Sequence, residues 1–384
     1  MLPKGLGIKQ DPQSWSRPVY IPKAEFIKGV KTKSWTVVND SVQLLDMLVA
    51  NTAKDFMTEL TVETPSKPFF LGVGFYKPHL PWVFPKRYLE YYPEGAINLP
   101  SNPDPQKNMP EVAWTGHASV FNPKYRDIAA LNYTGEMNES RLPDDITKQL
   151  RRAYCTSISY IDDLVGDVLK HLDATGQANN TIIAFFSDHG WHLGENSRWG
   201  KATSFHLNAR APLMVHIPGT TDNGGTTNEK VEFVDIFPTL LEAAGIPPIQ
   251  KCPHNSHDVE LCRDGQSFMP LIKQPDLSWK EAVFWQVRGR QGRMGYTVFT
   301  GKYRYTIWTD ALEGPVKITN SGILAEELYN HTEDPYETNN ITDGGKYKTR
   351  VRRLLSRLRK LLKSAFNKGI YNDPENNCFD STCK

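Results

Sequence analysis

The sequence predicts an α/β protein, a mixed sheet sandwiched by helices, with a smaller C-terminal α+β subdomain carrying an antiparallel sheet. Three observations support this. Ile182–Phe186 is a short apolar run of branched and aromatic residues, typical of a strand buried on both faces. A long amphipathic helical pattern over 144–176 leads into it, which is half of a βαβ unit. From residue 281 onward, aromatic segments alternate with polar positions as in antiparallel strands.

Composition excludes several classes of protein. The chain has 384 residues, of which 39% are hydrophobic and 23% charged, the balance of an ordinary globular protein. Its net charge of +2 indicates no particular partner. No apolar run reaches the roughly 18 residues needed to span a bilayer, and the first residues lack the apolar core of a signal peptide. The absence of a nucleic-acid-binding module and of a Gly-rich phosphate loop argues against nucleic acid as a partner.

The remaining elements follow from local patterns. Apolar positions at helical spacing predict a helix over 40–58. Phe69–Tyr76 (FFLGVGFY) and Pro212–Pro218 (PLMVHIP) are predicted as two further buried strands. The proline-rich stretch 83–143 is expected to be an excursion that lines a substrate cleft. A helix that stops at Gly245 follows the third strand.

The first domain is expected to span residues 1–272 and the second residues 273–384. Near the end of the second domain, residues 346–368 form a predicted helix with ten Lys or Arg and no acidic residue. A basic face of this kind attracts sulfated glycans or anionic membranes. The commoner alternative is that its leucine stripe docks on its own domain while the charges are solvated.

Cysteines and glycosylation sequons indicate an oxidising compartment. Cys252 with Cys262, and Cys378 with Cys383, are closely spaced pairs in loops and are expected to form two disulfides. Their spacing does not fit a zinc site. Cys155 lies in a helical pattern and is expected to be a buried free thiol. The N-x-S/T sequons, which are candidate glycosylation sites, are at Asn39, Asn132, Asn138, Asn179, Asn330 and Asn340.

Candidate functional residues follow the strand at Ile182–Phe186. In open α/β sheets, ligands bind at the carboxyl ends of strands, and Ser187-Asp188-His189-Gly190 stands at such an end. Asp188 supplies oxygen ligands for Ca²⁺ or Mg²⁺, and His189 supplies a nitrogen ligand or carries a proton. The cation of Lys201 suits an anionic substrate. An Asp-His-Gly sequence is also often only a turn, and Trp191 is equally suited to packing on a sugar and to capping the strand.

A second candidate site follows the predicted strand Phe69–Tyr76. The segment reads Lys77-Pro78-His79-Leu80-Pro81, and prolines on both sides of His79 fix the local backbone. The alternative is a histidine satisfied within a proline-rich loop.

Taken together, these motifs resemble the sulfatases of the alkaline-phosphatase-like superfamily. The resemblance rests on SDHG-W-x-LGE with the following lysine, KPH-x-P, and SWS-x-P at Ser14. It rests also on VD-x-x-PT-L at Val234 and on ELY-x-x-x-x-DP-x-E-x-x-N at Glu327.

The resemblance implies a role for each candidate residue. Asp188 and His189 would bind Ca²⁺, Lys201 would bind the sulfate, and His79 would contact the ester oxygen and protonate it as it leaves. A sulfatase of this type removes sulfate from a glycosaminoglycan such as heparan or dermatan sulfate. The resemblance also implies a lysosomal or secreted location.

The sequence departs from the family pattern in three places. It contains no Asp-Asp pair after a first strand, no lysine-and-histidine segment before SWS, and no C-x-P/S-x-R motif, whose cysteine becomes the formylglycine nucleophile. The catalytic domain is therefore expected to be N-terminally incomplete, as in a truncated form. The isolated chain is expected to be inactive, because stabilising groups have no nucleophile to assist.

The sequence also leaves the substrate specificity undecided. Phe299 stands where an arginine that reads the substrate carboxylate is expected, and Lys302 or Arg304 is a candidate substitute. Three alternatives to the function are a non-enzymatic remnant that binds sulfated glycans, another sulfatase specificity, and a phosphoesterase of the same superfamily. The paired KPH-x-P and SDHG elements argue against the phosphoesterase.

Overall fold

The computed structural model describes residues 32–63, 67–114, 119–137, 140–253, 259, 261–310, 321–342, 353 and 355–360. The SWS-x-P segment, the pair Cys378 and Cys383, sequon Asn138 and most of the basic helix lie outside the described residues.

The chain divides into two compact units. The first holds the part up to Leu99 together with Ala118–Thr134 and Leu142–Asn180. The second holds Pro100–His117, Gly135–Arg141 and the chain from Thr181 onward. The domain boundary at residue 272 stays a prediction.

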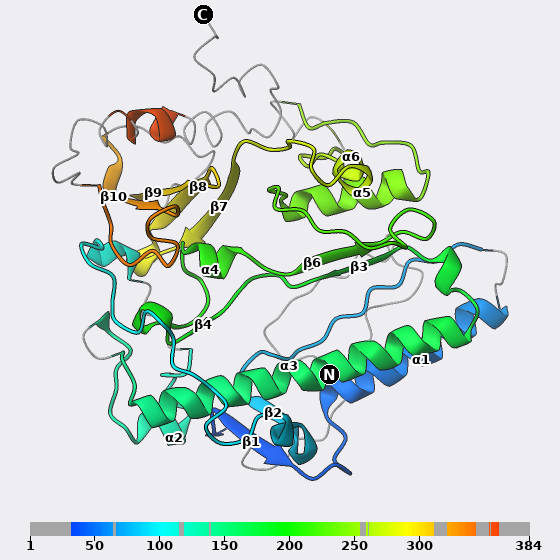
Figure 1. The fold of residues 1–384 in the computed structure, drawn as a ribbon, viewed down its shortest axis with the longest axis horizontal. Helices are drawn as coiled ribbons and strands as arrows, with labels where there is room; N and C mark the ends of the chain where they lie inside the picture. Colours follow the sequence, from blue (N-terminus) through cyan, green and yellow to red (C-terminus); the bar gives the residue numbers. More distant parts are fainter. Residues whose placement is uncertain are drawn as a thin grey trace, which may run out of the picture. The chain divides into compact units, whose positions relative to one another are not determined.

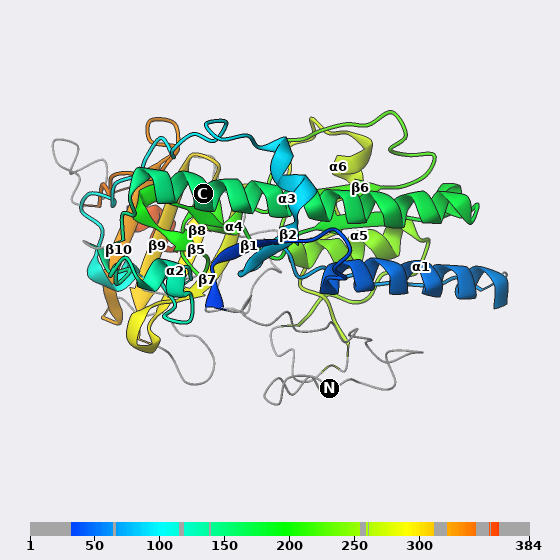
Figure 2. The same ribbon diagram turned by 90° about the horizontal axis from the view of Figure 1, so that it is seen from below.

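Two helices and a parallel strand pair build the first unit. Helix α1 (Leu45–Glu63) lies alongside α3 (Asp144–Ala174), as Figures 1 and 2 show. Strand β1 (Trp35–Val38) pairs in parallel with β2 (Trp82–Pro85). The shorter elements are η2 (Lys86–Tyr91), α2 (Arg126–Ala129) and η5 (Ala178–Asn180). Both predicted helices are therefore confirmed, with α1 beginning and ending about five residues later than predicted.

The core of the first unit explains why α3 takes this place. Its buried stripe includes Leu150 and Tyr160, and β2 contributes Trp82 and Phe84, all at most 1% exposed. The ring of Trp82 meets Tyr154 of α3 edge-on at 5.8 Å. Aromatic burial of this kind is a large apolar contribution to stability.

The predicted buried strand Phe69–Tyr76 is wrong. The segment is extended but joins no described strand, and its side chains alternate between half-buried and exposed. Phe70 is 73% exposed and Tyr76 is 46% exposed. A strand is buried on both faces only where other elements cover both faces of its sheet, and this segment joins no described sheet.

The predicted antiparallel sheet is present in the second unit, where it has four strands (Figure 1). Its order is β10–β9–β8–β7, from Ile323–Asn330, Tyr303–Thr309, Met294–Phe299 and Val283–Arg288. Val298, Tyr305 and Leu328 form its core, and Leu355 and Leu358 pack on them. The described part of the basic helix thus docks its leucine stripe on its own sheet.

Strands β3 (Ile183–Phe186) and β6 (Leu213–His216) form a separate antiparallel pair in the second unit. Helices α5 (Ile236–Ala243) and α6 (Met269–Lys273) lie along one face of this pair (Figure 1). There Ala184, Leu213 and Val215 pack against Ile236, Phe268 and Leu271.

The prediction that β3 and β6 are buried on both faces is wrong. Phe185 stands opposite Met214 on the face away from the helices, and the two are 37% and 59% exposed. Phe186 is 49% exposed. The apolar runs of these two segments predicted strands correctly, but burial depends on neighbouring elements that the run itself does not encode.

Short elements complete the second unit. They are η3 (Glu111–Ala113), β4 (His192–Leu193), η6 (Glu195–Ser197), β5 (Trp199–Gly200), α4 (His206–Ala209), η7 (Phe233–Asp235) and η9 (Arg290–Gly292). Among the described residues, no helix is both long and apolar enough to cross a membrane.

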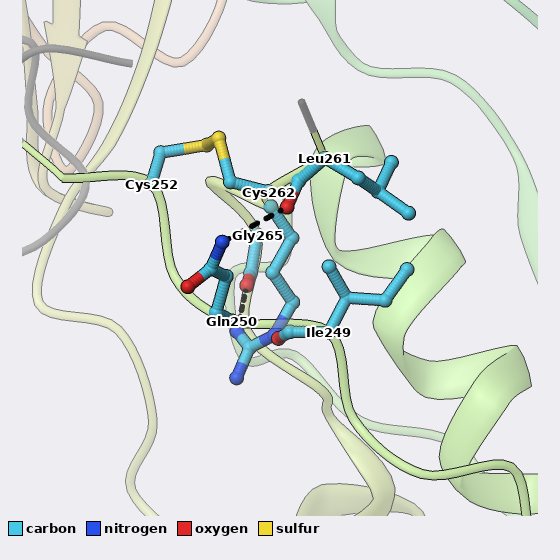
Figure 3. The surroundings of a disulfide bond; sticks show 7 residues. Ile249, Gln250, Cys252, Leu261, Cys262 and Gly265 are labelled. Carbon is cyan, nitrogen blue, oxygen red and sulfur yellow. Dashed lines mark hydrogen bonds between the residues drawn. A yellow bond between two sulfur atoms is a disulfide. The ribbon is translucent and has the colours of Figure 1, made fainter. Parts of the chain in front are cut away.

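A disulfide joins Cys252 and Cys262, whose Cα atoms are 4.8 Å apart (Figure 3). The two chain segments are also tied by backbone bonds, since Cys252 N donates to Arg263 O at 3.0 Å. Cys155 is a free, half-buried thiol on α3. Burial raises the pKa of Cys155, which disfavours its reactive thiolate.

Candidate functional site

The turn after β3 displays an aspartate and a histidine together. The Asp188 side chain is 81% exposed, and its Oδ2 atom lies 3.4 Å from Nε2 of His189. Nδ1 of His189 is 2.8 Å from the carbonyl oxygen of Gly190. Ser187 donates a further bond to the His189 carbonyl at 3.1 Å.

These contacts fix the tautomer of a neutral His189. A carbonyl oxygen only accepts, so Nδ1 must carry the proton and donate it to Gly190. Nε2 faces the Asp188 carboxylate; it carries a lone pair in the neutral ring, which suits a cation held between the two groups, and a proton in the charged ring, which pairs with the carboxylate directly. Metal-binding histidines in proteins use this arrangement, one ring nitrogen bonded to a carbonyl and the other turned to the metal.

A two-stranded hairpin explains how Trp191 and Lys201 come together. His192 of β4 pairs with Gly200 of β5, and Leu193 pairs with Trp199. Trp191 precedes the first strand and Lys201 follows the second, so the hairpin returns the lysine to the tryptophan. Nζ of Lys201 lies 5.9 Å from the centre of the Trp191 ring, within cation–π range. The His189 and Trp191 rings stack at 6.3 Å.

The turn of this hairpin has an unusual backbone that its neighbours hold in place. Gly194, Asn196 and Ser197 all have positive φ. Asn196 N donates to Asn102 O at 2.6 Å, and Asn196 Nδ2 donates to Tyr336 O at 3.1 Å. Such a conformation persists only where the surroundings determine it.

The hairpin rests on buried polar groups. Nε2 of His192 lies 2.9 Å from Thr203 Oγ1, and burial lowers the pKa of His192 to about 4, so the imidazole is neutral near pH 7. Arg198 donates to the Ala113 carbonyl at 3.0 Å. Burial lowers the pKa of Arg198 to about 10, which leaves it charged at pH 7.

Gly190 packs so closely against neighbouring backbone that only glycine, which has no Cβ atom, fits at this position. A Cβ atom there would lie 2.0 Å from the Leu207 carbonyl oxygen and 2.8 Å from that of Arg210. Gly190 N donates to Asn208 O at 2.7 Å. The turn that carries Asp188 therefore packs directly on the segment around α4.

His79 belongs to the first unit, where Asp46 and Lys77 hold its loop. The carboxylate of Asp46 accepts the backbone N–H of Tyr76, and Lys77 Nζ donates to the His79 carbonyl at 2.8 Å. Nδ1 of His79 is 2.6 Å from the Leu80 carbonyl oxygen, so it donates there and Nε2 carries the lone pair in the neutral ring. The peptide bonds before Pro78 and Pro81 are cis.

Charge in this loop is strongly perturbed by its surroundings. Burial lowers the pKa of Lys77 to about 8, although Asp46 acts in the opposite direction. Burial also raises the pKa of Asp46, against the backbone donors and the Lys77 cation. The sequence reasoning singled out His79 but missed Asp46 and Lys77, because Asp46 lies on a helix 30 residues away from Tyr76.

The structure therefore brings Asp188, His189, Trp191 and Lys201 together in one unit and places His79 in the other. Within the described part of the chain, no group of three or more His, Cys, Asp or Glu side chains is arranged to hold a metal ion. Asp188 and His189 alone do not fit a complete Ca²⁺ site, which needs six to eight oxygen ligands or their equivalents. Asp188 and His189 fit as two of the ligands of a larger Ca²⁺ site.

Comparison with known proteins identifies the family of this chain. Residues 11–246 match the family model described as Sulfatase. The chain belongs to the sulfatase family. Residues 189–364 also match the model described as N-sulphoglucosamine sulphohydrolase, C-terminal.

Named sulfatases are similar over most of this chain. Iduronate 2-sulfatase of Mus musculus is 32% identical over 86% of this chain and 70% of its own length. The Homo sapiens iduronate 2-sulfatase is 30% identical with the same coverage. An arylsulfatase of Clostridium perfringens is 28% identical over 82% of this chain and 56% of its own.

Solved structures share the fold. A protein in complex with its substrate D-glucosamine-2-N,6-O-disulfate superposes with a TM-score of 0.66 at 19% identity, covering 88% of this chain and 72% of its own. A structure described as a putative sulfatase from Bacteroides fragilis gives 0.60 at 21% identity, with 87% and 60% covered. The predicted sulfatase fold class is thus confirmed.

The structure contradicts one sequence-based alternative for this sulfatase. Arg304 is fully buried and its Nε donates to Glu337 at 2.6 Å, so it is not available to read a substrate carboxylate. Phe299 is also buried, between the rings of His206 at 4.6 Å and His331 at 4.9 Å.

The sequons differ in exposure. Asn39, Asn132 and Asn179 are exposed. Asn340 is 3% exposed and its amide nitrogen donates to the Asn108 and Glu326 carbonyls, so glycosylation there does not fit this fold. Asn330 is also buried.

Proposed function

We propose that this chain is part of a sulfuric ester hydrolase of the iduronate 2-sulfatase type, which removes sulfate from a glycosaminoglycan. The observation that carries the proposal is the hairpin that returns the Lys201 ammonium to the turn bearing Asp188 and His189. An acid, an imidazole and a cation then stand at one strand end. The resemblance to iduronate 2-sulfatases over most of the chain supports this substrate class.

Each residue has a defined task in this proposal. Lys201 binds the anionic sulfate, and Trp191 packs against a sugar ring. Asp188 and His189 are two ligands of Ca²⁺, which would add positive charge beside the sulfate oxygens. His79, in its protonated imidazolium form, would donate the Nε2 proton to the leaving oxygen, a task that suits a side chain whose ordinary pKa lies near working pH. A lysosomal or secreted location is part of the proposal.

The nucleophile is not among the printed residues. No printed cysteine stands in C-x-P/S-x-R, so a polypeptide of these 384 residues alone is expected to bind but not to turn over.

Binding of a sulfated heparan disaccharide, compared with its desulfated counterpart, tests the proposal. We expect the sulfated form to bind more tightly, and Lys201→Met to weaken it by about tenfold, since a charge-assisted bond is lost. Lys124→Met is the matched control, because Lys124 is an exposed lysine that also lies over an aromatic ring, at 4.7 Å.

Two outcomes would count against the enzyme. Equal binding of the two disaccharides contradicts a sulfate site at Lys201. Preference for the sulfated form that is unchanged by Lys201→Met and by removal of Ca²⁺ would favour the non-enzymatic glycan-binding alternative.

A further inference from the structure

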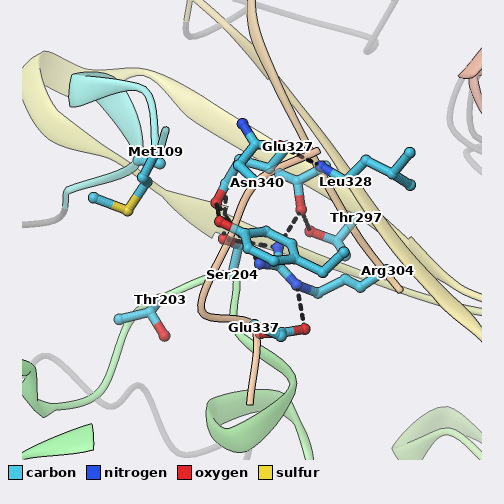
Figure 4. A network of polar contacts seen from close by, with 12 residues as sticks. Met109, Thr203, Ser204, Thr297, Arg304, Glu327, Leu328, Glu337 and Asn340 are labelled. Carbon is cyan, nitrogen blue, oxygen red and sulfur yellow. Dashed lines mark hydrogen bonds and ion pairs between the residues drawn. The ribbon is translucent and has the colours of Figure 1, made fainter. Parts of the chain in front are cut away.

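Three buried charges in the antiparallel sheet form a network that the catalytic proposal does not use. Arg304 lies on β9, Glu327 on β10, and Glu337 in the loop after β10. Their side chains are 0%, 0% and 3% exposed. We call these three residues the buried charge network (Figure 4).

The network is densely bonded. Arg304 Nε donates to Glu337 at 2.6 Å, and Arg304 Nη2 lies 3.7 Å from Glu327. Glu327 also accepts from Trp308 Nε1 at 2.8 Å and from the Tyr329 hydroxyl at 2.9 Å. Burial alone would raise the pKa of Glu337, but Arg304 and His331 lower it below its ordinary value. Glu337 is thus an anionic partner of the enclosed guanidinium, and Glu327 lies beside the same guanidinium.

Part of this network reaches outside the sheet, to the segment directly after Lys201. The hydroxyl of Ser204 lies 3.3 Å from Glu327 Oε2 and 3.3 Å from Arg304 Nη1. The backbone N–H of His206 donates to Glu337 Oε2 at 3.2 Å. Figure 4 shows Ser204 beside Arg304 and Glu327.

The same segment holds the other groups of the candidate site. Asn208 accepts the Gly190 N–H at 2.7 Å through its carbonyl, and its side chain accepts from Thr203 N at 3.3 Å. Gly190 is two residues from Asp188, and Ser204 is three residues from Lys201. Hydrogen bonds therefore connect the sheet to the segment and the segment to the turn at Gly190, while Lys201 is joined to Ser204 through the backbone of residues 202 and 203.

We propose that the buried charge network positions Lys201, acting through Ser204 and the segment 203–208. The inference deepens the proposed function, because it assigns to the C-terminal sheet the placement of the sulfate-binding cation. Removing both charges of a buried pair is often neutral for stability, whereas a fixed geometry is what such a pair specifies best. Glu327 begins the ELY motif and Glu337 ends the DP-x-E motif. The proposal therefore gives both motifs a role in placing Lys201.

Two hydroxyl deletions separate positioning from stability. Ser204→Ala removes the hydroxyl that links the network to the segment. Thr306→Val is the matched control, because the Thr306 hydroxyl accepts from the same Arg304 Nη1 at 2.8 Å but lies on β9, away from the segment. Each variant leaves the Arg304–Glu337 pair intact.

Lys201 itself supplies the readout. Reductive ¹³C-methylation of the lysines of the full chain gives one NMR signal pair per lysine, and Lys201→Arg assigns the signal of Lys201. Because Lys201 lies over Trp191, its chemical shift reports their geometry without any ligand. We expect Ser204→Ala to move this signal and Thr306→Val to leave it in place.

Titration of the Lys201 signal with inorganic sulfate is a second measurement. We expect Ser204→Ala to weaken binding by about threefold to tenfold, because a displaced cation binds less well, and Thr306→Val to leave it unchanged. If the Lys201 signal is the same in Ser204→Ala as in the unsubstituted chain, or moves equally in both variants, positioning is refuted. If sulfate does not shift the Lys201 signal in the unsubstituted chain, the proposed function is contradicted. The positioning is still tested in that case, by comparing the ligand-free Lys201 signal of Ser204→Ala with that of Thr306→Val.

Discussion

The two lysines nearest the candidate groups have different environments. Lys201 is half-buried and lies over an indole ring, whereas desolvation lowers the pKa of Lys77 to about 8. The fixed charge near Lys77 is Asp46, which opposes that shift. Asp46 accepts the N–H of Tyr76 and Lys77 donates to the His79 carbonyl, so two opposite charges hold the backbone on both sides of Pro78 and thereby the loop of His79.

Asp46→Asn is therefore expected to destabilise the protein by about 2 kcal/mol at pH 7, because it leaves a desolvated ammonium without its anion. The folded-state pKa of Lys77 lies below its ordinary 10.5, so the folded protein binds fewer protons than the unfolded chain between those values. The free energy of unfolding rises with pH in that window. In the variant the pKa of Lys77 falls further, and the window extends below pH 8.

Urea denaturation at pH 7 and pH 9 measures this. The loss of unfolding free energy in Asp46→Asn, relative to the unsubstituted protein, is expected to be smaller at pH 9 than at pH 7, because Lys77 loses its proton in between. Asp40→Asn is the control, since its exposed pair with Arg87 at 3.5 Å contributes little. A deficit that is equal at both pH values would show that the charge of Lys77 is not involved.

Among the elements, the contact between the turn after β3 and the segment at α4 is the tightest one described at the site. Gly190→Ala would place a methyl group against two backbone oxygens, and backbone has little room to yield. We expect a loss of about 2 kcal/mol or more and a displaced Lys201 signal.

Gly166→Ala is the matched substitution. Gly166 lies inside α3 with open space around its Cβ position, so alanine there is expected to stabilise the helix by about 0.5–1 kcal/mol. Thermal unfolding of both variants gives the comparison. Similar effects from the two alanines would mean that the Gly190 contact is not tight in solution.

Elements with a strong periodic pattern were predictable from the sequence. The stripe of α3 and the aromatic-rich segments of β7, β8 and β9 are local signals, and the structure confirms the helix and the antiparallel strands. The predicted alternation of buried and exposed positions is not found in β8 and β9, which are buried at almost every position. The SDHG turn and Lys201 were found by motif, but the hairpin that joins Trp191 to Lys201 was not. Its strands have two residues each, too short to show any period.

Long-range partners were not predictable at all. Nothing local shows that Arg304 meets Glu337, 33 residues away, or that Ser204 meets Glu327, 123 residues away. Burial of Phe69–Tyr76 and of β3 was overestimated for the same reason, because it depends on what lies beside the strand.

For the whole molecule, the exposed face of β3 and β6 is the feature that governs behaviour in solution. Ile183, Phe185 and Met214 share it, and both outer edges of the pair join no other described strand. Exposed apolar strands with free edges favour self-association.

Met214→Lys is expected to reduce self-association and to change the free energy of unfolding by no more than about 0.5 kcal/mol, because Met214 is 59% exposed. Val215→Lys, one residue along on the helix-covered face, is expected to cost about 3 kcal/mol. Sedimentation velocity and urea denaturation measure the two effects. Equal destabilisation by both substitutions would show that this face is covered in solution.

The Trp191–Lys201 hairpin constrains how this region can change over evolutionary time. Successive residues of a strand point to opposite faces, so one inserted or deleted residue in the turn would shift the pairing and turn Lys201 away from Trp191. Amino acids in the turn are free to drift where they tolerate its positive φ angles, but its length is not. A natural variant with a one-residue indel between Gly194 and Arg198 would lose the lysine from the site without losing it from the sequence.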